Sequence, residues 1–172
     1  MLEADYLQKS DEILQNLREI PLLKSFDEKD LQGLSRMSAI KRYEQGEFII
    51  DEKFQDNWIY FLISGLVRIT KGGKEIRVLR RRGDIFGEMS AIDGSTRSAS
   101  AYAIDETVCL AMNTSRIDKL LGNEKFAFYS ILYKSFAETL AERLRSTTKE
   151  LVEAKGKIEQ LQFELDQLKS DR

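Results

Sequence analysis

The side chains best suited to chemistry gather in one short stretch of the chain, from Gly87 to Ala99. Gly87 lets the backbone turn sharply and approach a ligand closely. Glu88 opens an expected short helix, Glu88–Ile92, whose unpaired N–H groups would face an anion. Arg97 adds a permanently charged guanidinium that can bind phosphate oxygens in pairs. This combination suits a compact ligand that carries one phosphate group.

The acidic residue in this stretch narrows the ligand further. A carboxylate beside an anion is repulsive unless it has another task, and accepting hydrogen bonds from sugar hydroxyls is such a task. Glu88 therefore indicates a ribose next to the phosphate. Ser98 and Ala99 are small and leave room for such a ligand. The alternative is an ordinary salt bridge between Glu88 and Arg97 that pins a loop, and these two residues alone leave both interpretations open.

The composition excludes several other chemistries. The chain has 172 residues, a formal net charge of −2 and no histidine, so the commonest general base and metal ligand is missing. Its single cysteine, Cys109, cannot form an intrachain disulfide or a cysteine cluster for a metal. No nucleophile stands with a visible base. We expect no enzyme activity, no catalytic residue and no bound metal, and the balanced charge argues against a nucleic-acid partner.

Nothing in the sequence predicts a membrane segment. No apolar run approaches the roughly 20 residues that a spanning helix needs. The N-terminus, Met1–Asp5, is acidic where a signal peptide is basic. We therefore expect a cytoplasmic protein without a membrane partner.

Three regions must position the candidate residues. Residues 1–40 show helical spacing, with a second helix expected to start near Ser25 or Asp27. Residues 41–113 hold seven of the ten glycines, at 46, 65, 72, 73, 83, 87 and 94, between short runs rich in aromatic and β-branched residues. The pair Gly72-Gly73 predicts a type I′ hairpin. Residues 114–172 are helical again, so the fold class is mainly β with flanking α-helices.

The end of the chain carries a heptad repeat typical of a coiled coil. Positions a and d, counted from Ala137, are Ala137, Leu140, Leu144, Thr147, Leu151, Ala154, Ile158, Leu161, Leu165 and Leu168. Nine of these ten are apolar. Opposite charges at positions g and e, Glu150 with Lys155 and Glu164 with Lys169, favour a parallel homodimer through residues 137–172. The alternative is one amphipathic helix that lies on the chain's own sheet.

Several segments together resemble the cyclic nucleotide-binding domain family. Gly87–Ser90 followed by Arg97–Ala99 is similar to the phosphate-binding cassette of that family, which we place at residues 83–101. Further matching segments occur in the family's order, namely Ile20–Leu23, Tyr43–Ile49, Tyr60–Gly65 and Gly83–Phe86. The resemblance implies an eight-stranded antiparallel β-roll, similar to a double-stranded jelly roll. One departure is Lys53–Asn57, which stands where the family often has a glycine-rich turn.

The resemblance also implies a role for each cassette residue. Arg97 would pair with the cyclic phosphate, and Glu88 would accept a hydrogen bond from the ribose 2′-hydroxyl. The other cassette residues would shape the loop or donate backbone N–H groups, and these are Gly87, Met89, Ser90, Ser98 and Ala99.

The C-terminal helix bears on which base is bound. Residues 141–149 resemble the dimer helix of bacterial transcription activators in the same family, where hydroxyl side chains reach the adenine. Thr147 and Thr148 match those hydroxyl residues. A buried hydroxyl needs a partner, which adenine would supply, although Thr147 can also bond its own helix backbone. This favours cAMP, whereas the hydroxyl of Ser98 also suits guanine and keeps cGMP open.

The function that follows is a cyclic nucleotide receptor, with cAMP as the expected ligand, that signals through a dimeric C-terminal helix to a downstream protein the sequence does not identify. One alternative is a cGMP-binding module. Others are the ligand-binding half of a transcription regulator and a scaffold that keeps the fold without binding. The charged pair of Glu88 and Arg97 argues against the scaffold.

Overall fold

The computed structural model describes residues 2–24, 26–117 and 123–170. The chain divides into two units, residues 1–132 and 133–172. The elements of the first unit are α1 (Leu2–Glu19), η1 (Pro21–Leu23), α2 (Glu28–Ser35), β1 (Ser38–Tyr43), β2 (Phe48–Ile50), β3 (Trp58–Ser64), β4 (Val67–Lys71), β5 (Lys74–Leu79), β6 (Ile85–Phe86), α3 (Glu88–Asp93), β7 (Ser100–Ala103), β8 (Thr107–Asn113) and α4 (Thr114–Ile117). Helix α5 (Asn123–Ser170) begins in the first unit and continues through the second.

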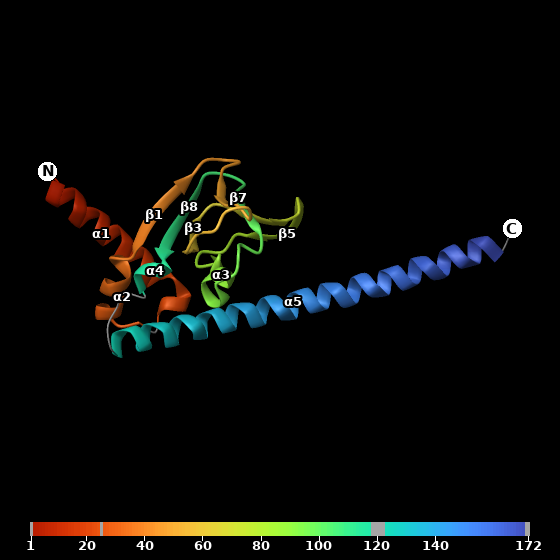
Figure 1. Ribbon diagram of the computed structural model, residues 1–172. Coiled ribbons are helices and arrows are strands. Elements are labelled where there is room, and N and C mark those ends of the chain that lie inside the picture. The colour runs from red at the N-terminus through yellow and green to blue at the C-terminus, as the bar shows by residue number, and fades with distance from the viewer. Residues whose placement is uncertain (1, 25, 118–122, 171–172) are drawn as a thin grey trace. The chain divides into compact units, whose positions relative to one another are not determined.

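Within the described residues, eight strands form two antiparallel sheets, in the orders β1-β8-β3-β6 and β2-β7-β4-β5 (Figure 1). The apolar core lies between the sheets, because inward side chains from both meet there, for example Tyr60 and Leu62 with Val67 and Ala101. Burial of this apolar surface stabilises the folded chain by about 25 cal/mol for each Å² removed from water. This architecture confirms the predicted β-roll with N-terminal helices and a long C-terminal helix.

Local sequence signals explain several element boundaries. Gly72 and Gly73 both have positive φ, 55° and 77°, as the type I′ turn between β4 and β5 requires. Helix α2 begins after Asp27, whose side chain accepts a hydrogen bond from the Asp30 N–H at 2.8 Å. The other predicted start of this helix, Ser25, lies outside the described residues. Across the part of the chain that the structure describes, every helix is too short or too polar to cross a membrane.

The seam of the predicted coiled coil is exposed on the single chain. The large apolar seam residues are 51% to 68% exposed, and they are Leu144, Leu151, Ile158, Leu161, Leu165 and Leu168. Helix α5 runs without a break through all of them. The helix itself is therefore as expected, and its pairing with a second copy stays a prediction.

Two buried acidic groups, a cysteine thiol and a tyrosine hydroxyl, predict that the free energy of unfolding falls at alkaline pH. Cys109 is fully buried, and burial raises the pKa of its thiol from 9.0 to about 12. Burial likewise raises the pKa of Tyr60 to about 12. The unfolded chain loses these protons first, so the free energy of unfolding should fall above about pH 9, by up to about 1.4 kcal/mol per pH unit for each group. Urea unfolding at pH 8 and pH 10.5 measures this fall, and Cys109→Ala should show a smaller one.

Candidate functional site

Two glycines in the left-handed conformation bound the short helix of the candidate site. Gly87 has a φ of 79° and precedes α3, and Gly94 has a φ of 68° and ends it. The Gly94 N–H donates to the Ser90 carbonyl at 3.1 Å. Residues with a Cβ rarely adopt this conformation, so the glycines fix where the helix starts and stops. The helix predicted over Glu88–Ile92 is present and one residue longer.

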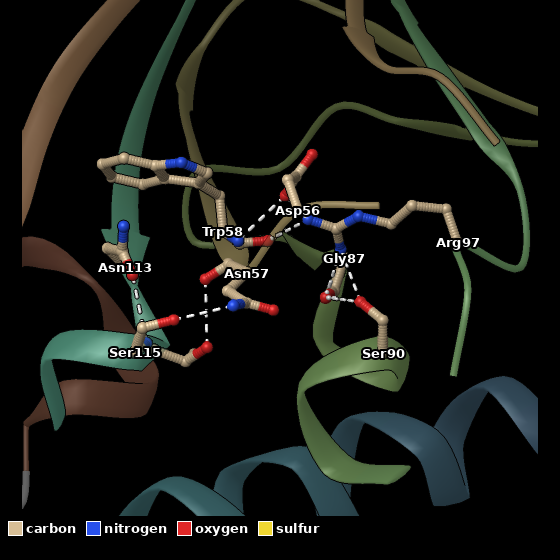
Figure 2. A network of polar contacts seen from close by, with 9 residues as sticks. Asp56, Asn57, Trp58, Gly87, Ser90, Arg97, Asn113 and Ser115 are labelled. Carbon is tan, nitrogen blue, oxygen red and sulfur yellow. Dashed lines mark hydrogen bonds and ion pairs between the residues drawn. The ribbon is translucent and has the colours of Figure 1, made fainter. Parts of the chain in front are cut away.

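Arg97 is buried behind this helix, with 3% of its surface exposed. Its Nη1 donates to the Gly87 carbonyl at 2.7 Å and to the Ser90 hydroxyl at 2.8 Å. Its Nη2 donates to the Trp58 carbonyl at 2.6 Å and pairs with the Asp56 carboxylate (Figure 2). The chain itself thus occupies all four terminal N–H bonds of the guanidinium.

The fifth N–H donor of Arg97, at its Nε, differs from the four terminal N–H groups in its hydrogen bonding. Among the residues that the structure describes, the Nε of Arg97 is the buried side-chain nitrogen or oxygen that has no hydrogen-bond partner. A buried donor without an acceptor costs about 1–3 kcal/mol. A positively charged group with one spare donor is suited to an anionic ligand.

The sequence did not reveal the acidic partner of Arg97. The carboxylate that pairs with Arg97 is that of Asp56. The alternative of a salt bridge between Glu88 and Arg97 is therefore replaced by one between Asp56 and Arg97. Asp56 lies within Lys53–Asn57, the segment that departs from the family's glycine-rich turn. Its Oδ1 also accepts from the Trp58 N–H at 2.9 Å, a local turn typical of Asp two residues before its donor. That turn signal was available in the sequence.

The remaining predicted residues fall into two groups. Around α3, Glu88 is buried, Met89 is 45% exposed, and the Ser98 hydroxyl donates to the Met89 sulfur at 3.4 Å. Ala99 is half-buried next to them in the chain. Thr147 and Thr148 are exposed on α5 in the second unit. The structure therefore brings the cassette residues together, and the contribution of the two threonines stays a prediction.

The position of Gly87 predicts a large effect of adding one methyl group. A Cβ there would lie 2.7 Å from the Arg97 Nη1 and 2.9 Å from the Ile50 Cδ1. At Gly94, by contrast, a Cβ would meet nothing within 4 Å, although φ is positive there too. Both Ala variants should lose about 1–2 kcal/mol of unfolding free energy to backbone strain. Gly87→Ala should lose clearly more in urea unfolding because it also crowds Arg97, and equal losses would contradict this placement.

Comparison with known proteins finds a family model and several relatives that match part of this chain. Residues 40–124 match the family model for the cyclic nucleotide-binding domain. The chain is 28% identical over 126 residues to a cGMP-dependent protein kinase of Toxoplasma gondii, an alignment that covers 73% of this chain and 13% of the kinase. It is 27% identical over 106 residues to a cAMP-dependent protein kinase regulatory subunit of Debaryomyces hansenii, covering 62% of this chain and 24% of the subunit. The chain therefore spans a quarter or less of the length of these relatives.

Solved structures show the same fold. A cyclic nucleotide-binding domain from Methylobacillus flagellatus superposes with a TM-score of 0.66 at 23% identity, covering 81% of this chain and 80% of that chain. The regulatory domain of Toxoplasma gondii protein kinase A, solved with cAMP, superposes with a TM-score of 0.63 at 17% identity, covering 77% of this chain and 51% of that chain.

Proposed function

We propose that this chain, whose residues 40–124 match the cyclic nucleotide-binding domain family, is a non-enzymatic receptor for a cyclic nucleotide monophosphate. The single observation that carries the proposal is the buried Nε of Arg97, which has no acceptor within the described residues. An oxygen of the cyclic phosphate would accept from this Nε while the other N–H bonds stay in place. The negative charge of the ligand would face a guanidinium that the fold already holds rigidly.

Other residues of the cassette would contact the ribose and the base of the ligand. Glu88 is almost completely buried in the first turn of α3, beside the residue that binds Arg97. In this position its carboxylate would accept a hydrogen bond from the ribose 2′-hydroxyl. Among the described residues, the Ser98 hydroxyl donates to the Met89 thioether, a weak acceptor, so a base or phosphate can replace that hydrogen bond. We propose cAMP as the ligand on the strength of Thr147 and Thr148, with cGMP as the second candidate because of Ser98.

The proposal includes a homodimer through α5. The large seam residues are at least 51% exposed, from Leu144 to Leu168, and an apolar row of this length needs a covering partner in water. A second copy fits because Glu150 and Glu164 would face Lys155 and Lys169 of that copy. The dimer would act as the signalling element toward a downstream protein in the cytoplasm.

Calorimetric titration of the purified chain with cAMP and cGMP tests the receptor function. Adenosine 5′-monophosphate is the matched control, since it keeps the base and ribose but lacks the cyclic phosphate. We expect binding of a cyclic nucleotide, with cAMP tighter than cGMP and the open nucleotide much weaker. No heat and no thermal shift at millimolar cAMP and cGMP would refute the proposal and favour the non-binding scaffold.

A further inference from the structure

Met89 is the most exposed sulfur-containing residue in the part of the chain that the structure describes. It is 45% exposed, whereas Met37 is 6% exposed and Met112 is fully buried. Met1 lies outside the described residues. Cys109 is fully buried, and burial raises the pKa of its thiol to about 12, so the reactive thiolate does not form near neutral pH. A dissolved oxidant therefore reaches the sulfur of Met89 before the buried sulfurs.

The exposed methionine lies within the candidate site. Met89 is the second residue of α3 and stands between the buried Glu88 and Ser90. The Ser90 hydroxyl accepts from the Arg97 guanidinium at 2.8 Å (Figure 2). The sulfur of Met89 accepts from the Ser98 hydroxyl at 3.4 Å. A chemical change at this sulfur therefore acts directly on Ser98, a residue that we propose contacts the ligand.

Oxidation changes how well this sulfur group accepts a hydrogen bond. With hydrogen peroxide, a lone pair of the sulfur attacks one peroxide oxygen, an S–O bond forms and the O–O bond breaks. The other oxygen leaves with both peroxide protons as water, so the sulfur loses two electrons and the peroxide is reduced. The thioether is a weak acceptor, whereas the sulfoxide is polar and accepts through its oxygen. Because a serine has a single O–H to donate, the sulfoxide holds the Ser98 hydroxyl more firmly than the thioether does.

We propose that Met89 is a site of reversible oxidation by hydroperoxides, and that its sulfoxide lowers the affinity of the chain for a cyclic nucleotide. The inference rests on the receptor function proposed above. In the reduced chain, the ligand replaces a weak hydrogen bond from Ser98 to the thioether. In the oxidised chain, the ligand must break a stronger hydrogen bond from the same hydroxyl. Methionine sulfoxide reductases remove the added oxygen, so the change is reversible.

Mild treatment of the purified chain with hydrogen peroxide tests the site. Peptide mass spectrometry should find the added oxygen at Met89 well before it appears at Met37 or Met112. Calorimetric titration of the oxidised chain should then show cAMP binding that is about two- to tenfold weaker, the range for one neutral hydrogen bond. Incubation with methionine sulfoxide reductases of both stereospecificities should restore the original affinity.

Each variant is compared with itself before and after peroxide. Met89→Leu has no sulfur at this position, so peroxide should leave its affinity where it started, and any loss caused by oxidation elsewhere would persist in it. Met37→Leu is the matched control, since it removes a buried methionine and should respond to peroxide as the wild-type chain does. The proposal is overturned if the buried methionines are oxidised as fast as Met89, if the oxidised wild-type chain binds cAMP as tightly as before, or if Met89→Leu loses as much affinity.

The receptor function and the oxidation site fail separately. If the untreated wild-type chain binds neither cAMP nor cGMP, the receptor function is wrong. The oxidation site is then tested without ligand, by urea unfolding of the wild-type chain and Ser98→Ala before and after peroxide. Oxidation should change the two free energies of unfolding by different amounts, because only the wild-type chain has the hydroxyl that the sulfoxide can hold. Equal changes would overturn the proposed contact between the sulfoxide and Ser98.

Discussion

Replacing Arg97 with lysine is expected to weaken cAMP binding about 10- to 150-fold. Lysine keeps the charge but has no Nε in the fork and cannot hold its several acceptors at once. Each hydrogen bond to a charged group contributes about 1.5–3 kcal/mol, which is the basis of this range. The loss should appear for cGMP as well, because the phosphate is common to both ligands. Calorimetric titration of the wild-type chain and the variant with both nucleotides measures it.

Arg82→Lys is the matched control for this substitution. Arg82 also makes an ion pair, with Glu19, and its Nη2 donates to the Asn16 side chain at 2.7 Å. These contacts join the loop before β6 to α1, and none of them involves Arg97 or its partners. The control should therefore bind cAMP as the wild-type chain does. An Arg97→Lys protein that unfolds normally in urea and binds within twofold of the wild-type chain would contradict the proposed phosphate site.

The sequence predicts the β-roll because its signals are local. The double glycine between alternating strands specifies one hairpin, and the glycines on either side of α3 set its length. Each of these features depends on backbone conformations that few other residues adopt, so the residue type alone carries the information. The heptad repeat is local in the same sense and predicts the uninterrupted helix α5.

The partners of Arg97 are harder to predict because they come from far along the chain. Asp56 lies 41 residues before Arg97, and the Trp58 carbonyl lies 39 residues before it. Only the pairing of β3 within its sheet brings this segment to the cassette, and a backbone carbonyl has no signature in the sequence. The sequence therefore offers Glu88, the carboxylate nearer to Arg97 in the chain, as an alternative ion-pair partner, whereas the structure pairs Arg97 with Asp56.

The row of apolar residues on α5 leads to the second prediction, which concerns the oligomeric state. Ile158→Asp is expected to convert the proposed homodimer into a monomer, because it places a charge in the centre of an apolar seam. Light scattering should then report about half the mass of the wild-type protein, whose chain is 19.9 kDa. Phe163→Asp is the matched control, since Phe163 is 64% exposed on the same helix but lies at position f, away from the seam.

The same variant tests whether the seam and the ligand site act together. Thr147 lies on the seam, so the proposed dimer would offer a hydroxyl from each copy to the adenine. Ile158→Asp should then weaken cAMP binding as well as dissociate the dimer, although residue 158 is eleven positions from Thr147. Phe163→Asp should do neither. A wild-type chain that is a monomer by light scattering would rule out the seam, whereas a monomeric Ile158→Asp with full affinity for cAMP would remove the threonines from the site and leave Arg97 as its centre.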